Sequence, residues 1–200
     1  MKNIEFIYRE LLYRILEKKE RRFTQSELSQ NLGISLSIVN NAIKKLSDIG
    51  AVKILPRSFH VLDIKKALYF WASLRNLKKD IVFSLRVDLP VREMERIMPS
   101  GVIYTAYSAY KFRFKDVPAD YSEVYVYANE KEIENIQKRL SLKKNKKNLR
   151  PNLFVLKKDS FIEKYKDIPL AQIFVDLWNL NEWYAKDFFN AIEKKILEEI

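Results

Sequence analysis

The sequence predicts an α+β protein with two folded parts, and three observations carry this prediction. Residues 23–62 contain two helical patterns joined by a glycine and followed by a strand-turn-strand pattern. From residue 81 onward, short β patterns alternate with helical ones, which is typical of a small sheet covered by helices. With 200 residues and 48% hydrophobic content, the chain is long enough for two small domains that each bury a core.

The N-terminal elements have clear helix signals. An apolar stripe at helical spacing precedes the charged run EKKERR and predicts a first helix; it consists of Ile4, Ile7, Leu11, Leu12 and Ile15. Thr24 is placed to cap a second helix, Glu27 can reach back to the cap amide, and Phe23 can pack on Leu28. Gly33 then supplies a turn before Ser35, a second candidate cap.

The third helix has two different faces. Its apolar residues recur at helical spacing and predict the buried face: Val39, Ala42, Ile43 and Leu46. Ser37, Asn40, Asn41 and Lys44 project from the opposite face. Their amides and hydroxyl can meet base edges, and the cation can meet phosphate, so this face is a candidate DNA-reading surface.

Three features resemble winged helix-turn-helix transcription regulators: SELSQNLGIS, SIVNNAIKKL, and Gly50 before a strand. The resemblance implies that the third helix lies in the major groove and that the following hairpin touches the neighbouring backbone or minor groove. By position it implies DNA-binding roles for Ser37, Asn40, Asn41, Lys44, Lys45, Lys53, Arg57 and His60. Leu36 and Ile38 depart from the usual polar pattern and either touch thymine methyls or pack on a neighbouring element. The alternative is a protein-protein module, a role that winged helices also serve.

Charge agrees with a nucleic-acid partner. The formal net charge is +11, and a cationic field of this size attracts polyanions. The predicted DNA-binding region holds or adjoins several of the cations: Lys44, Lys45, Lys53, Arg57, Lys65 and Lys66. A Lys- and Glu-rich chain without cysteine also resembles thermophile compositions, so charge alone does not decide the function.

Other classes of protein are disfavoured. No apolar run approaches the roughly 20 residues of a membrane span, and we expect a cytoplasmic protein without a membrane partner. Zero cysteines and one histidine disfavour a thiolate or histidine metal site, and we expect no cofactor. Asp116, Asp120 and Glu123 are candidates for a nucleotidyltransferase metal site, but Asp120 and Glu123 are three apart and would point to opposite faces of a strand. We therefore interpret these carboxylates as solvated loop and strand-end charges and expect no enzymatic activity.

The domain boundaries follow the change of pattern. Residues 1–66 form the predicted winged helix-turn-helix domain, 67–80 a connecting helix or linker, and 81–200 a small α+β domain with a helical C-terminus. The connecting helix is capped by Asp63 and has an apolar face that suits either a linker or a dimer helix: Ile64, Ala67, Leu68, Trp71 and Leu74.

In the second domain, IVFSLRVDL, SEVYVYAN and NLFVLK read as strands. VREMERIM and EKEIENIQKRLSL read as helices, and the chain from Pro169 reads as two helices split near Asn181.

Aromatic and basic residues of the second domain leave alternatives open. YTAYSAYKF reads as helix or strand, and the alternation of Phe112 and Phe114 with basic residues favours a half-buried strand over a stacking surface for single-stranded nucleic acid. Trp178 and Trp183 read as helix-packing residues, although one can anchor a dimer or partner interface. The basic loop from Lys143 to Arg150 is either solvated or a second phosphate contact.

Several blocks of residues 81–200 resemble the AbiEi-type antitoxin and regulator family: GVIYTAYSAYKF, SEVYVYANEKEIENIQKRL, NLFVLKKD and IPLAQIFVDLWNLNEWYAKDFFNAIEKKI. The last block carries Asp176-Leu177 on one helix and an Asn179-Leu180 break before another. The resemblance implies a cytoplasmic prokaryotic protein whose winged helix represses a promoter. From the whole sequence we expect a regulator that binds double-stranded DNA as a homodimer, on an inverted or direct repeat. In the antitoxin members, the C-terminal domain also contributes to neutralising a nucleotidyltransferase-like toxin. Tyr104 to Tyr110, where the family often has a glycine-containing turn, departs from the pattern, so a regulator without a toxin partner is the other interpretation.

Overall fold

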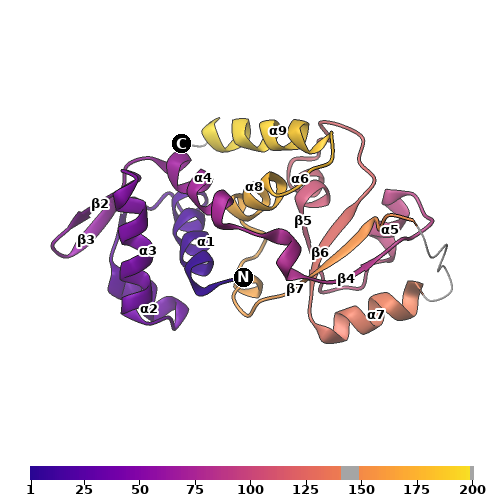
Figure 1. Ribbon diagram of the computed structural model, residues 1–200, viewed down its shortest axis with the longest axis horizontal. Coiled ribbons are helices and arrows are strands. Elements are labelled where there is room, and N and C mark those ends of the chain that lie inside the picture. The colour runs from indigo at the N-terminus through magenta and orange to yellow at the C-terminus, as the bar shows by residue number, and fades with distance from the viewer. Residues whose placement is uncertain (141–148, 199–200) are drawn as a thin grey trace.

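The computed structural model describes residues 1–140 and 149–198. Figure 1 shows a helical part at one end of the long axis and a β-sheet with its covering helices at the other. Most of the basic loop predicted from Lys143 to Arg150 therefore lies outside the described residues; only Leu149 and Arg150 of that stretch are described.

The N-terminal part combines three helices with a small sheet. Its helices are α1 (Asn3–Leu16), α2 (Gln25–Leu32) and α3 (Leu36–Asp48). Its strands are β1 (Arg22–Phe23), β2 (Val52–Leu55) and β3 (Ser58–Val61), in the sheet order β1-β3-β2. β2 and β3 form an antiparallel hairpin directly after α3, and Figure 1 shows this hairpin projecting at the left end of the molecule.

The C-terminal part contains a four-stranded mixed sheet of order β4-β7-β6-β5. The strands are β4 (Ile81–Leu85), β5 (Ile103–Thr105), β6 (Val124–Ala128) and β7 (Leu153–Lys157). β6 and β7 are parallel and flank α7 (Glu130–Leu140) in the chain, whereas the β4-β7 and β5-β6 pairs are antiparallel. A parallel pair needs a long crossover connection, and the segment that contains α7 supplies it.

The central strand β6 is buried on both of its faces, which explains its continuous apolar sequence VYVYA. Val124 and Val126 point to one face, where α5 (Val91–Ile97) and α7 pack. Tyr125 and Tyr127 point to the other, toward α6 (Ala106–Phe114) and α8 (Leu170–Trp178). Alternate side chains of one strand thus join two different hydrophobic clusters.

The helix α4 (Ile64–Leu74) belongs to the larger of these clusters, which it shares with α1 and α8. Its predicted apolar face is buried, with Trp71 fully covered, except that Leu74 is 38% exposed. α4 therefore neither crosses solvent as a linker nor offers this face to a second copy. The predicted domain limits stay a prediction, but one continuous core runs across residues 67–80.

A short 3-10 helix, η1 (Leu77–Asp80), follows α4, and a second one, η3 (Ile162–Lys164), precedes α8. The last helix, α9 (Ala185–Glu198), runs back along the molecule toward α4, as Figure 1 shows. The Tyr69 hydroxyl of α4 donates to Glu193 of α9 at 2.6 Å. This contact joins residues 124 positions apart and ties the last helix to the N-terminal part.

A buried polar network lies between α4, α8 and the sheet. Asp176 is fully buried and accepts hydrogen bonds from Arg75 at 3.0 Å, Thr105 at 2.7 Å and Tyr127 at 2.6 Å. Arg75 also pairs with Asp80 at the end of η1. Because each charged group has partners, the network satisfies the demand that burial imposes on ionised side chains.

The aromatic segment after β5 is a helix, so the prediction of a half-buried strand around Phe112 and Phe114 was wrong. In α6, Tyr107 and Tyr110 lie one turn apart, and both contact Phe188 of α9, at ring-centroid distances of 4.9 and 5.6 Å. This helical spacing prevails over the two-residue alternation because it buries two tyrosines completely, which leaves them in the core rather than on a stacking surface.

Two further interpretations need correction. Glu123 is buried, only 7% exposed, and accepts a hydrogen bond from the Tyr184 hydroxyl, so it is not a solvated strand-end charge. Trp183 is 78% exposed and does not pack between helices, whereas Trp178 contacts Tyr69 while remaining 44% exposed. Local patterns gave no signal for either difference, because both depend on how α9 and its preceding turn cover the sheet.

Candidate nucleic-acid interface

Two short helices meet at a tight turn beside α1. Thr24 Oγ1 accepts a hydrogen bond from the Glu27 amide at 3.1 Å and caps α2 as predicted. Gly33 ends α2 with φ of 58°, a left-handed conformation that glycine adopts without steric penalty. The Ser29 hydroxyl donates to the Ile34 carbonyl oxygen at 2.7 Å. Side-chain and backbone hydrogen bonds therefore fix the turn that sets the direction of α3 relative to α2.

Two details of the predicted caps differ. The Glu27 carboxylate lies 2.5 Å from Arg14 Nη2, in an ion pair that joins α2 to α1, and does not complete a capping box. A guanidinium offers this carboxylate a charge-assisted hydrogen bond, which is stronger than a bond from a neutral amide. Ser35 occupies the N-cap position of α3, but its side chain makes no capping hydrogen bond.

The inner face of α3 is anchored to α1. The four predicted apolar residues of this face are fully buried: Val39, Ala42, Ile43 and Leu46. The Tyr8 hydroxyl of α1 donates to the Ala42 carbonyl oxygen at 3.1 Å, and burial raises the pKa of Tyr8, so the hydroxyl stays a neutral donor. α3 is thus held in one orientation, which fixes its outward face.

The outward face of α3 carries the predicted polar residues, and all of them are exposed: Ser37, Asn40, Asn41 and Lys44. Asn40 Nδ2 donates to Gln25 Oε1 at 3.1 Å, so part of its amide is committed to α2. Within residues 1–140 and 149–198, no side-chain hydrogen bond or ion pair occupies Asn41 or Lys44. Asn41 can therefore offer both its donor and its acceptor to a partner.

The two apolar residues at the start of α3 behave differently. Leu36 is 52% exposed on the outside of the helix, whereas Ile38 is half-buried and packs against the core. Only Leu36 is therefore free to meet a thymine methyl.

The three-stranded sheet carries a row of basic side chains on one face. His60 of β3 lies opposite Arg22 of β1 and opposite Lys53 of β2, so these three residues are cross-strand neighbours. Phe23 and Phe59 occupy the next register position, are buried, and stack at 5.6 Å. Arg22 and Lys53 are exposed and His60 is half-buried, so this row lies on the face opposite the buried rings.

The remaining basic residues divide into two groups. Lys44 and Lys45 of α3, Lys53 and Arg57 of the hairpin, and Lys66 of α4 are exposed and have no ionic partner in the described part of the chain. Lys65, which the sequence places near the same region, pairs with Glu193 of α9 at 2.9 Å. Lys65 is therefore committed to the fold.

Sequence reasoning missed two residues of this region. Arg22 belongs to a strand of two residues, which is too short to show a period, although its alternation with buried Phe23 is a signal in retrospect. Gln25 at the start of α2 carries no sequence signal for its bond to Asn40, since the bond depends on the angle between two helices.

Comparison with known proteins agrees with this geometry. Residues 9–57, about a quarter of the chain, match the family model of an HTH domain. This stretch is a helix-turn-helix domain, and the match supports a DNA-binding transcription regulator. Neither the curated proteins nor the solved structures gave a match.

Metal-binding groups and membrane-spanning helices are both absent from the described residues. Among residues 1–140 and 149–198, no three histidine, aspartate or glutamate side chains gather in a group that suits a metal ion. In the same residues, none of the helices has the length and apolar character needed to cross a membrane.

Proposed function

We propose that the protein is a sequence-specific, double-stranded-DNA-binding transcriptional regulator that represses a promoter. The observation that carries the proposal is the outward face of α3, where Asn41 and Lys44 are exposed and unpartnered within the described chain. In this proposal α3 lies in the major groove, where an asparagine amide can bond both to N6 and to N7 of adenine. The buried inner face of α3 keeps these groups in fixed positions.

The β2-β3 hairpin acts as a wing in this proposal. Lys53 and His60 face outward from it, and Arg57 lies in its exposed turn. Contacts of such residues to phosphate position the protein but read no sequence. Arg22 of β1 lies opposite His60 in the same row.

The test is selection of bound duplexes from a random pool at about 0.15 M salt, where nonspecific phosphate binding is weak. We expect a recovered motif with two half-sites, because the proposed regulator binds as a homodimer to an inverted or direct repeat. Asn41→Ala should relax the preference at one base pair by about 1 to 3 kcal/mol, whereas Lys53→Ala should weaken all sequences alike.

Asn190→Ala is the matched control, because Asn190 is exposed on α9, in the C-terminal part of the chain. It should leave the recovered motif unchanged. If folded protein enriches no sequence, or if Asn41→Ala recovers the wild-type motif in full, α3 is not the reading helix.

A second candidate function is an antitoxin-like interaction protein with secondary DNA binding. The observation that favours it is Trp183, which is 78% exposed, since tryptophan is enriched at the centres of protein interfaces. A neighbouring reading frame that encodes a nucleotidyltransferase would favour this function. Co-expression with that toxin would test it: wild-type protein should rescue growth, and Trp183→Ala should not.

A further inference from the structure

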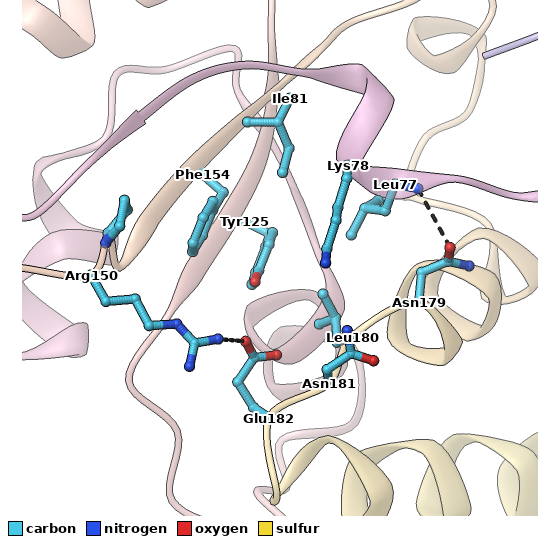
Figure 2. A pocket seen from close by; sticks show the side chains of 11 residues that line it. Leu77, Lys78, Ile81, Tyr125, Arg150, Phe154, Asn179, Leu180, Asn181 and Glu182 are labelled. Atoms are coloured by element: carbon cyan, nitrogen blue, oxygen red, sulfur yellow. Dashed lines mark hydrogen bonds and ion pairs between the residues drawn. The ribbon is translucent and has the colours of Figure 1, made fainter.

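A pocket of about 210 Å³ lies between the sheet and the connection from α8 to α9. Figure 2 shows Tyr125 and Phe154 side by side on the sheet side of this pocket. Their rings stack with centroids 4.7 Å apart and planes only 9° from parallel. Leu77 of η1 and Leu180 after α8 supply apolar surface on the other side. The pocket is therefore lined by flat aromatic and aliphatic groups, as small-molecule sites commonly are.

The charges around the pocket do not cancel. Glu182 pairs with Arg150 at 2.6 Å and accepts a hydrogen bond from the Tyr107 hydroxyl at 3.1 Å, so its charge has a partner. Lys78 lines the same pocket, and Figure 2 shows its side chain extending toward the space between Tyr125 and Leu180. No ion pair or side-chain hydrogen bond holds the Lys78 ammonium within residues 1–140 and 149–198. One positive charge is left over.

Asn181 provides a second free polar group at this place. Its side chain lines the pocket, and no hydrogen bond to another described residue engages its amide. The neighbouring Asn179 amide, by contrast, donates to the carbonyl oxygens of Ala72 and Val175. A ligand acceptor can therefore bond to Lys78 and Asn181 without displacing a bond of the fold.

We propose that this pocket binds a small planar aromatic monoanion, with an aromatic carboxylate as the simplest form. A cavity of about 150 Å³ with apolar walls admits benzene, so the volume here suits one ring with an acidic substituent. In this proposal, the ligand ring packs between the wall formed by Tyr125 and the side chain of Leu180. The ligand carboxylate accepts hydrogen bonds from Lys78 and Asn181. This binding is independent of the proposed DNA contacts, because the pocket is lined only by residues that follow α4.

Isothermal titration calorimetry at millimolar concentrations of benzoate and its neutral isostere benzamide tests the proposal on the full chain. We expect one benzoate per chain and at least about tenfold weaker binding of benzamide, because a hydrogen bond to a charged group is worth more than one between neutral groups. Lys78→Met should weaken benzoate about tenfold and leave benzamide unchanged. Lys79→Met is the matched control on the same short helix and should change neither, since Lys79 does not line this pocket.

A blocking variant separates the pocket from other sites. Asn181 is exposed, so Asn181→Trp should fold normally while filling the opening, and it should weaken both probes. Three results would overturn the proposal: no heat with either probe, equal affinity for benzoate and benzamide, or wild-type benzoate affinity in both Lys78→Met and Asn181→Trp.

Discussion

The salt dependence of DNA binding gives a quantitative test of which cations touch phosphate. Four exposed cations of α3 and the hairpin region have no ionic partner in the described chain: Lys44, Lys45, Lys53 and Arg57. Each phosphate contact changes the slope of log K against log salt by about −0.9, so four contacts give about −3.6 per chain. Replacing Lys53 or Arg57 with glutamine should reduce the slope to about −2.7.

The chain supplies its own control for this prediction. Lys65 is equally basic and close to the hairpin in sequence, but Glu193 neutralises it at 2.9 Å. Lys65→Gln should therefore keep the wild-type slope. Between about 50 and 200 mM salt, affinity should fall about 150-fold for wild type and Lys65→Gln, but only about 40-fold for Lys53→Gln.

Fluorescence anisotropy with a labelled duplex measures these slopes. If the protein binds as a dimer, each slope doubles, but the fractional loss in Lys53→Gln stays at about one quarter. The comparison between variants thus does not depend on stoichiometry. The reasoning is refuted if Lys65→Gln loses as much slope as Lys53→Gln, because ion pairing would then not decide which cations reach phosphate.

Two predictions concern buried charges. Arg75→Met should lower the free energy of unfolding by about 3 to 5 kcal/mol in chemical denaturation, because it leaves the Asp176 carboxylate buried without its cation. The control Lys79→Met changes an exposed residue and should alter this free energy by less than about 0.5 kcal/mol. Equal effects of the two substitutions would refute the stabilising role of Arg75. Burial, and next the charge of Glu182, raise the pKa of Glu123, so its ionised form destabilises the folded state above that pKa. Glu123→Gln should therefore raise the melting temperature near pH 8, and the gain should vanish as the pH falls to about 3, more than one unit below the pKa of about 4.3 in the unfolded chain, where the carboxyl is neutral in both states; an equal gain at both pH values would contradict this cause.

The sequence predicted α3 and its two faces because a period of 3.6 residues recurs over the whole helix. Val39 and Leu46 lie on the buried face of this helix, whereas Asn41 and Lys44 lie on its exposed face. This spacing does not fit the two-residue period of a strand. β1 escaped prediction because two residues cannot show a period. α6 was ambiguous because its sequence contains both a helical tyrosine spacing and a two-residue alternation, and only the position of Phe188 decides between them.

Contacts between distant residues set the limit of prediction for the site. Lys65 looks like a DNA contact in the sequence, but its partner Glu193 is more than 120 positions away. Arg9 is fully buried and bonds through both terminal nitrogens to Asp159, at 2.6 and 2.8 Å. A local sequence pattern cannot predict such ion pairs, because each partner taken alone resembles a charged residue of the surface. Which cations are free for DNA therefore depends on the tertiary structure.

The residues that carry the C-terminal family resemblance have a structural explanation. Asp176 holds Arg75, Thr105 and Tyr127 in the buried network, and the Asn179 amide donates to the Ala72 carbonyl oxygen at 3.3 Å. These polar groups bind α8 to α4 and to the sheet, so a protein with this arrangement of elements needs such groups whatever its partner.

Asp176 and Asn179 are therefore explained by the packing of this chain's own elements, and these two positions carry no information about a toxin. A substitution of Asp176 cannot test a partner role, because it should unfold the protein, and an unfolded variant loses every activity alike. Exposed residues outside the network discriminate better. Trp183 is 78% exposed and joins the Tyr184 ring only at its edge, 5.2 Å between centroids, so its removal should spare the fold. A partner role therefore has to be sought at Trp183, where loss of function can be separated from loss of structure.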